Sequence, residues 1–133
     1  MIAGIADTHT ALWYLFSDER LGKDASAFLE TTVASGDHIG LSAISLAEIV
    51  YLIEKERIPL TALDDVLAAI HDPKNVLKQL AFDDTIAVHM LQIPRKQIPD
   101  LPDRIIAATA LFYGVPVLSR DGRIRASSLK TIW

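Results

Sequence analysis

The 133-residue sequence contains no cysteine and no long hydrophobic run. The lack of cysteine excludes disulfides and metal sites built on thiolates, and it is compatible with a reducing cytoplasm. No stretch approaches the roughly 18 to 20 apolar residues that a membrane span needs. The amino terminus has no basic region ahead of an apolar segment, so we expect a cytoplasmic protein without a signal peptide. A P-loop and a G-x-G-x-x-G motif are also missing, which leaves nucleotide binding by backbone amides unsupported.

Basic residues are scarce in the first two thirds of the chain. The net charge is −4, which argues against a generally basic nucleic-acid binder. Residues 1–94 hold 6 basic and 14 acidic residues, a balance of −8, whereas residues 95–133 hold 7 basic and 3 acidic residues, a balance of +4. A basic last third could hold a polyanion against an acidic site, although a solvated face is the simpler explanation of the charge alone.

Short apolar segments alternate with amphipathic ones along the chain. Strands are expected at residues 2–6, 38–41, 76–82, 117–119 and 130–133. Helices are expected at residues 8–16, 23–35, 45–57, 60–70, 83–92 and 103–113. This alternation predicts right-handed crossovers and an α/β fold whose central, mostly parallel sheet is flanked by helices. The length fits one domain over residues 1–133.

Four acidic residues fall at the ends of predicted elements, where an α/β fold places its ligands. They are Asp7, Glu48, Asp103 and Asp121. Each also has a structural explanation. Asp7 is a favoured helix cap, and Ser45-x-x-Glu48 has the pattern of a capping box. Asp103 would be stabilised by a helix dipole and Asp121 fits a turn, where Ser119 could donate a hydrogen bond to it.

The position of all four acids at one edge of the sheet favours a cation site over four separate caps. Crowded carboxylates repel one another, so some must bind protons or the group must bind a cation. Oxygen ligands without cysteine select a hard ion, Mg²⁺ or Mn²⁺. Such ions usually serve phosphoryl chemistry, in which they orient a water molecule and stabilise charge on the phosphate oxygens.

Segments along essentially the whole chain, in order, resemble the PIN-domain ribonucleases, most closely the VapC toxins of type II toxin–antitoxin pairs. They are IADTHTALW, LSAISLAEI, LPDRIIAATALFYGVPVLSRDGRI and KTIW. The resemblance implies a PIN-like three-layer fold, metal-dependent cleavage of RNA, a homodimer and inhibition by a small VapB-like antitoxin. By position, the family's catalytic acids fall on Asp7, Glu48, Asp103 and Asp121, and Ser119 matches its hydroxyl group.

On this interpretation Asp7 and Asp103 are the main ligands of Mg²⁺ or Mn²⁺, and Asp121 and Glu48 complete the site directly or through water. Four arginines are candidates for contacts with the RNA backbone, Arg104, Arg120, Arg123 and Arg125. An antitoxin could insert a basic residue among the acids, or lay an apolar segment along the predicted helix at residues 8–16.

Two alternatives stay open from the sequence. The same site could cleave DNA or structured RNA. The chain could also be a catalytically idle, receiver-like module that binds Mg²⁺ and a partner. Receiver domains expect paired acids after the first strand and a lysine after the last, whereas Asp7 stands alone and the final strand offers no such lysine.

Overall fold

The computed structural model describes all 133 residues and contains one sheet of five parallel strands. The strands are β1 (Ile2–Ala6), β2 (His38–Ser42), β3 (Leu77–Leu80), β4 (Val117–Leu118) and β5 (Thr131–Ile132). The helices are α1 (Thr8–Leu15), α2 (Lys23–Ser35), α3 (Ala43–Glu54), α4 (Ala62–His71), α5 (Asp84–His89), the 3₁₀ turn η1 (Met90–Gln92), α6 (Leu101–Tyr113) and α7 (Gly122–Ala126). The predicted α/β class and parallel sheet are confirmed. None of the helices has the length and apolar character that crossing a membrane requires.

The strands are arranged in the order β3-β2-β1-β4-β5. The chain therefore builds outward from β1 in one direction through β2 and β3, and in the other through β4 and β5. The strand order reverses between the neighbouring strands β1 and β4. Open α/β sheets bind their ligands outside the carboxyl ends of the strands at such a point. The order differs from the 2-1-3-4-5 order of flavodoxin-like receiver domains, so the receiver-like alternative is wrong at the level of topology.

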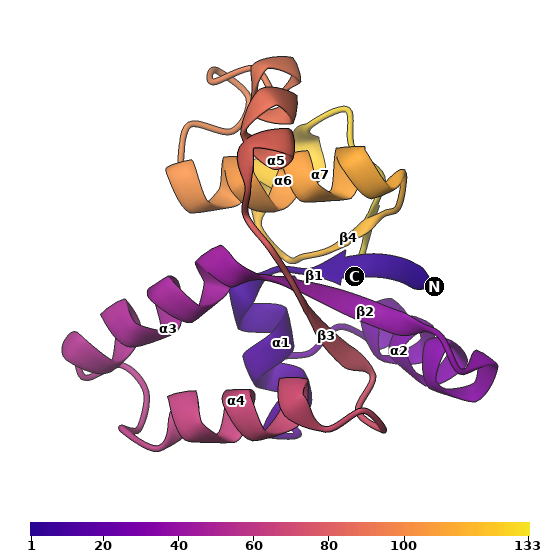
Figure 1. Cartoon of the computed structure of the whole chain (residues 1–133), viewed down its shortest axis with the longest axis vertical. Helices are drawn as coiled ribbons and strands as arrows, with labels where there is room; N and C mark the ends of the chain where they lie inside the picture. Colours follow the sequence, from indigo (N-terminus) through magenta and orange to yellow (C-terminus); the bar gives the residue numbers. More distant parts are fainter.

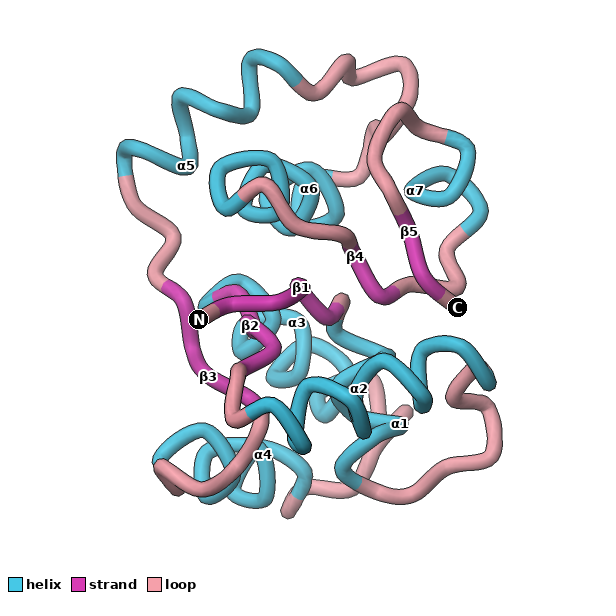
Figure 2. Tube along the Cα trace, turned by 90° about the vertical axis from the view of Figure 1, so that its right-hand side faces the viewer, coloured by secondary structure: helices cyan, strands magenta, loops and turns pink.

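Helices cover both faces of the sheet. In Figure 1, α1 to α4 lie below the strands and α5 to α7 lie above them, and Figure 2 shows the same two layers from the side. Neighbouring side chains on a strand point to opposite faces. Ile5 and Val117 accordingly pack in the core between the sheet and α5 to α7. Ala6 and Leu118 pack in the core between the sheet and α1 to α4.

Near the site, the structure differs from the prediction at three helices. Helix α3 begins at Ala43 instead of residue 45, and α6 begins at Leu101 instead of residue 103. The short helix α7 was not predicted at all. Gly114 ends α6 with φ of 67°, a left-handed conformation that side chains disfavour, and this sharp exit lets the chain return beside β1 as β4.

Candidate active site

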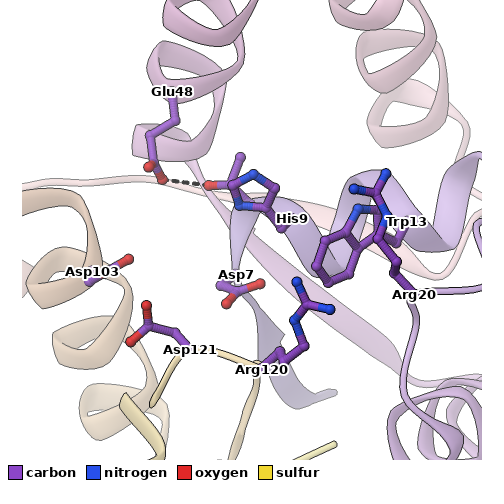
Figure 3. Close-up of a pocket in the computed structure, with 9 residues that line it drawn as sticks. Asp7, His9, Trp13, Arg20, Glu48, Asp103, Arg120 and Asp121 are labelled. Carbon is purple, nitrogen blue, oxygen red and sulfur yellow. Dashed lines mark hydrogen bonds between the residues drawn. The ribbon is translucent and has the colours of Figure 1, made fainter. Parts of the chain in front are cut away.

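A cleft of about 290 Å³ opens at the carboxyl ends of β1 and β4, and Figure 3 shows its lining side chains. The lining is almost entirely polar. It brings together all four acids that the sequence singled out, and it adds five further residues. The complete lining is Asp7, Thr8, His9, Trp13, Arg20, Glu48, Asp103, Arg120 and Asp121.

Asp7 is held by hydrogen bonds to both of its carboxylate oxygens. It directly follows β1 and caps α1, where its Oδ1 accepts a hydrogen bond from the Thr10 amide at 2.9 Å. Its Oδ2 accepts a hydrogen bond from the Ser119 hydroxyl at 2.5 Å. The side chain is also buried, with only 8% of its surface exposed. The capping role suggested for Asp7 is therefore real, and it coexists with a position in the cleft.

Asp121 enters the cleft from the loop after β4. It is the cap of α7, and its Oδ1 accepts hydrogen bonds from the amides of Arg123 (2.9 Å) and Ile124 (3.0 Å). Its own amide donates to the Ser119 Oγ at 3.0 Å. The prediction that Ser119 donates to Asp121 is wrong, because its hydroxyl proton goes to Asp7. Ser119 instead links the two acids, accepting from the Asp121 backbone and donating to the Asp7 side chain.

Glu48 is not part of a capping box. The cap of α3 is Ser42, three residues earlier than the capping-box pattern predicts, and Ser45 lies inside the helix, fully buried. Glu48 is consequently one turn further along α3, where it faces the cleft. Its Oε1 accepts a hydrogen bond from the Thr8 hydroxyl at 2.5 Å, and the Thr8 Oγ1 lies 2.8 Å from the Ser45 Oγ.

The pKa of Glu48 is raised from its ordinary value, mainly by burial. The hydrogen bond from Thr8 opposes this increase, and the negative charges of Asp100 and Asp7 add to it. A carboxylate in this position is more easily protonated than one in water.

The sequence suggested that α6 begins at Asp103, but Asp103 is not the cap of this helix. Asp100 is the cap, and its Oδ2 accepts a hydrogen bond from the Asp103 amide at 3.0 Å. The Asp103 carboxylate projects from the first turn of α6 and accepts no hydrogen bond from the protein. Burial raises its pKa to about 7, and the carboxylates around it, Asp100, Asp121, Glu48 and Asp7, contribute to the increase.

The donor set of the cleft fits a hard divalent cation. All four acids offer oxygen atoms, and burial together with the neighbouring carboxylates raises the pKa of Asp103 and of Glu48. As the side chains stand, no three carboxylates or imidazoles are gathered around one point. Carboxylates that repel one another stand apart, and a bound cation would draw them together.

The other predicted substrate contacts divide into two groups. Arg120 lines the cleft. Arg104 does not line it, because its Nη2 donates to the backbone carbonyls of Met90 (3.1 Å) and Ile93 (3.3 Å) and so ties η1 to α6. Arg123 lies outside the cleft beside Lys96, in a separate shallow depression. Arg104 is therefore better explained as a structural residue than as a substrate contact.

Four residues that the sequence did not single out also line the cleft, Thr8, His9, Trp13 and Arg20. The first three follow Asp7 on α1, so their proximity to the site could have been read from the motif. Nothing in the sequence around Arg20 signals its position. The Cζ atoms of Arg20 and Arg120 lie 5.0 and 4.7 Å from the ring centroid of Trp13.

Comparisons with known proteins place the chain in a family. A family model described as "PIN domain" matches residues 5–128. The chain is 29% identical over 126 residues to Ribonuclease VapC22 of Mycobacterium tuberculosis, covering 95% of this chain and 92% of that protein.

Solved structures share the fold. VapBC2 of Rickettsia felis, crystallised with a DNA fragment from its promoter, matches with a TM-score of 0.68 at 17% identity, covering 98% of this chain and 97% of that one. VapC20 of Mycobacterium tuberculosis, described as a sarcin–ricin loop cleaving toxin, matches with a TM-score of 0.65 at 14% identity, covering 96% of each chain.

Proposed function

This chain belongs to the PIN-domain family, and from that premise we propose that it is a divalent-cation-dependent endoribonuclease of the VapC toxin type. The observation that carries the proposal is the convergence of Asp7, Glu48, Asp103 and Asp121 on one cleft at the topological switch point. The relatives named as a ribonuclease and as an RNA-loop cleaving toxin support RNA as the substrate.

Asp7 and Asp103 would be the main cation ligands, and Asp121 and Glu48 would complete the site directly or through water. A bound Mg²⁺ or Mn²⁺ supplies a Lewis acid that stabilises charge on the phosphate oxygens and lowers the pKa of a water molecule. Ser119 keeps the Asp7 carboxylate fixed by its hydrogen bond. Thr8 does the same for Glu48, because its hydroxyl donates to Oε1.

The protein's own groups can also handle the proton that hydrolysis releases. Adding water across a P–O bond requires a base to take one proton from the water. Glu48 is the candidate for this base, because it lines the cleft and its Oε2 is free of the Thr8 hydrogen bond. Arg120, on the same wall as Asp121, would contact the RNA backbone.

Purified protein incubated with single-stranded or loop-containing RNA tests the proposal. We expect cleavage with Mg²⁺ or Mn²⁺, none with excess chelator, and recovery when the cation is restored. An Asp7→Asn, Asp103→Asn double variant prepared in parallel is the control for contaminating nucleases. Cleavage that continues undiminished in chelator would reject the cation-dependent mechanism.

We also propose a VapB-like antitoxin as partner and a homodimer as the assembly, over one nuclease domain of residues 1–133. Solved relatives from Rickettsia felis and Salmonella typhimurium are VapBC complexes. A second cleft adjoins the active site and shares Trp13 and Arg20 with it; half of its lining is apolar, including Leu12, Phe16 and Ile58, and the rest is polar or charged. Phe16 is 43% exposed, so an apolar segment of a partner could cover it.

The Asp7→Asn, Asp103→Asn double variant separates two modes of inhibition. If the partner inserts a basic residue among the acids, affinity should fall sharply in the double variant and little in Asp64→Asn, a change on the distant helix α4. Equal binding of the cognate partner by wild type and double variant would favour blocking by an apolar segment instead. Light scattering of the isolated protein tests the dimer.

A further inference from the structure

The wall of the cleft beside the carboxylates carries two positive charges on one aromatic ring. The guanidinium carbons of Arg20 and Arg120 lie 5.0 and 4.7 Å from the Trp13 ring centroid, within the range of a cation–π contact. Figure 3 draws the two guanidinium groups above and below the indole. We call this arrangement the Arg–Trp–Arg stack (Arg20, Trp13 and Arg120). Its arginines come from the loop after α1 and the loop after β4.

The ring at the centre of the stack is fixed by the fold. Trp13 is only 7% exposed and packs edge-on against Trp133, with centroids 5.7 Å apart at 63°. Trp133 is held in turn, because its carbonyl accepts hydrogen bonds from the amides of Asp24 (2.8 Å) and Ala25 (3.0 Å) at the start of α2. The ring is therefore held in place before a ligand binds, which reduces the entropy lost on binding.

The stack has an uncompensated positive charge. Arg20 forms two hydrogen bonds to Asp18, from Nε to Oδ1 at 3.0 Å and from Nη2 to Oδ2 at 2.8 Å. Arg120 has no carboxylate partner, since the ion pairs in the structure join Arg20 to Asp18 and the Met1 amino group to Asp37. Two arginines and one carboxylate leave one positive charge, which suits one phosphodiester.

The stack lies next to the acids without overlapping them. Arg120 immediately precedes Asp121 and follows Ser119, so an anion bound at Arg120 would be adjacent to one facing Asp7 and Asp121. Phosphate near the acids alone is repelled, whereas phosphate near the stack is attracted. An RNA strand with one phosphate at the acids and the next at the stack would gain attraction at the stack that offsets repulsion at the acids.

We propose that the Arg–Trp–Arg stack is a second phosphate subsite, which binds the RNA phosphate adjacent to the one that is cleaved. This inference rests on the proposed function for its ligand, RNA. Guanidinium groups bind phosphate through paired, charge-assisted hydrogen bonds, and stacking on the indole keeps their edges turned toward the cleft. Arg20 and Trp13 thereby become substrate-positioning residues.

Binding without turnover is the first test. A labelled RNA oligonucleotide is titrated against wild type, Arg20→Gln and Arg120→Gln in chelator, which removes the cation that the proposed hydrolysis requires. Each change should weaken binding about tenfold and lower the slope of log affinity against log salt by about 0.7, the value for one lost contact on a single strand. Arg120→Lys, which keeps the charge but not the planar stack, should recover part of the affinity. Arg95→Gln, an exposed arginine outside the cleft, is the matched control.

A second test locates the phosphate. Once the cleaved bond is mapped, RNA substrates are made with an uncharged methylphosphonate at the neighbouring linkage on either side. One of them should raise KM about tenfold for wild type, with kcat nearly unchanged, and have little effect on Arg120→Gln, which has already lost the contact. Thermal unfolding of each variant, measured beside these assays, checks that the fold is intact.

The outcomes distinguish failure of the subsite proposal from failure of the ribonuclease proposal. Affinity and salt slope unchanged in a folded Arg120→Gln protein would overturn the subsite, as would an equal methylphosphonate penalty in wild type and variant. If wild type binds the oligonucleotide with the expected dependence on both arginines but cuts no RNA with any divalent cation, the ribonuclease proposal fails and the subsite stands.

Discussion

The carboxylates of the cleft are held in two different ways on its two sides. On the strand side, Asp7 and Asp121 together accept four hydrogen bonds, three from backbone amides and one from Ser119. On the helix side, Glu48 accepts one hydrogen bond and Asp103 accepts none from the protein. The helix-side carboxylates are also the two whose pKa values are raised.

This difference shows how the fold prepares a cation site. The strand-side acids cap α1 and α7, so their positions are set whenever the protein folds. The helix-side acids are placed by α3 and α6, and neither has a cationic side chain within ion-pair distance. We infer that the strand side supplies a rigid half of the site, and that the helix side supplies the affinity for a cation.

The largest effect should come from Asp103→Asn. The change removes one negative charge but keeps the shape, so activity should fall by about 100-fold or more while the melting temperature in chelator stays equal or rises. Asp100→Asn is the matched control, because asparagine still caps α6 and the same charge is lost three residues away. Wild-type cleavage by folded Asp103→Asn would show that the residue is not a ligand.

Alanine substitutions of a strand-side acid and of a helix-side acid should have different effects on the free energy of unfolding. Asp7→Ala removes the cap of α1 and leaves the buried Ser119 hydroxyl without its acceptor, which should destabilise the protein by about 2 kcal/mol. Asp103→Ala, in chelator, should be neutral or stabilising because it relieves repulsion. Urea unfolding of both variants measures the difference. Similar destabilisation by the two changes would contradict the division into two sides.

The pKa of Asp103 predicts a pH dependence with a definite sign. Its folded-state value of about 7 lies above the ordinary value of 3.8, so the folded protein binds the proton more tightly than the unfolded chain. This contribution to stability is complete below pH 3.8 and is lost as the pH rises toward about 7. In chelator, wild type should therefore lose stability between about pH 4 and about pH 7 relative to Asp103→Asn.

A saturating divalent cation should reverse that trend. The ion stabilises the ionised carboxylate, so wild type should gain stability with rising pH when Mg²⁺ is present. Urea unfolding across this pH range, with and without the ion, makes the comparison. A difference between wild type and Asp103→Asn that does not vary with pH would mean that Asp103 titrates near its ordinary value.

The smallest effect should come from Glu48→Gln. Glutamine can still accept the hydrogen bond from Thr8, so stability should change by less than about 0.5 kcal/mol. Activity should fall about tenfold, equivalent to about 1.4 kcal/mol in the barrier, because the charge and the basic oxygen are lost. Isothermal titration with Mn²⁺ should show weaker binding. Unchanged rate and unchanged cation affinity would remove Glu48 from the site.

Local pattern was enough to predict the framework of the molecule. The apolar segments before Asp7 and Asp121 can be recognised from neighbouring residues alone. Strand β1 ends directly before Asp7, and β4 ends at Leu118, three residues before Asp121. Hydrophobic periodicity indicates which segments are buried, so it predicted the α/β class. The four acids were then recognised by their positions near the ends of the predicted segments. The helix starts did not follow, because Ser42 and Ser45, and likewise Asp100 and Asp103, offer competing caps of similar quality.

By itself, then, the sequence determined the order of strands and helices, the parallel sheet and the four acids near the carboxyl edge of that sheet. Tertiary structure alone decided which partner each side chain has. Ser119 donates to Asp7 across 112 positions of the chain, and Arg20 meets Arg120 on the ring of Trp13. The physical reason is that such contacts join segments brought together by the packing of the sheet and its helices. No local propensity encodes which distant hydroxyl, ring or charge will be near.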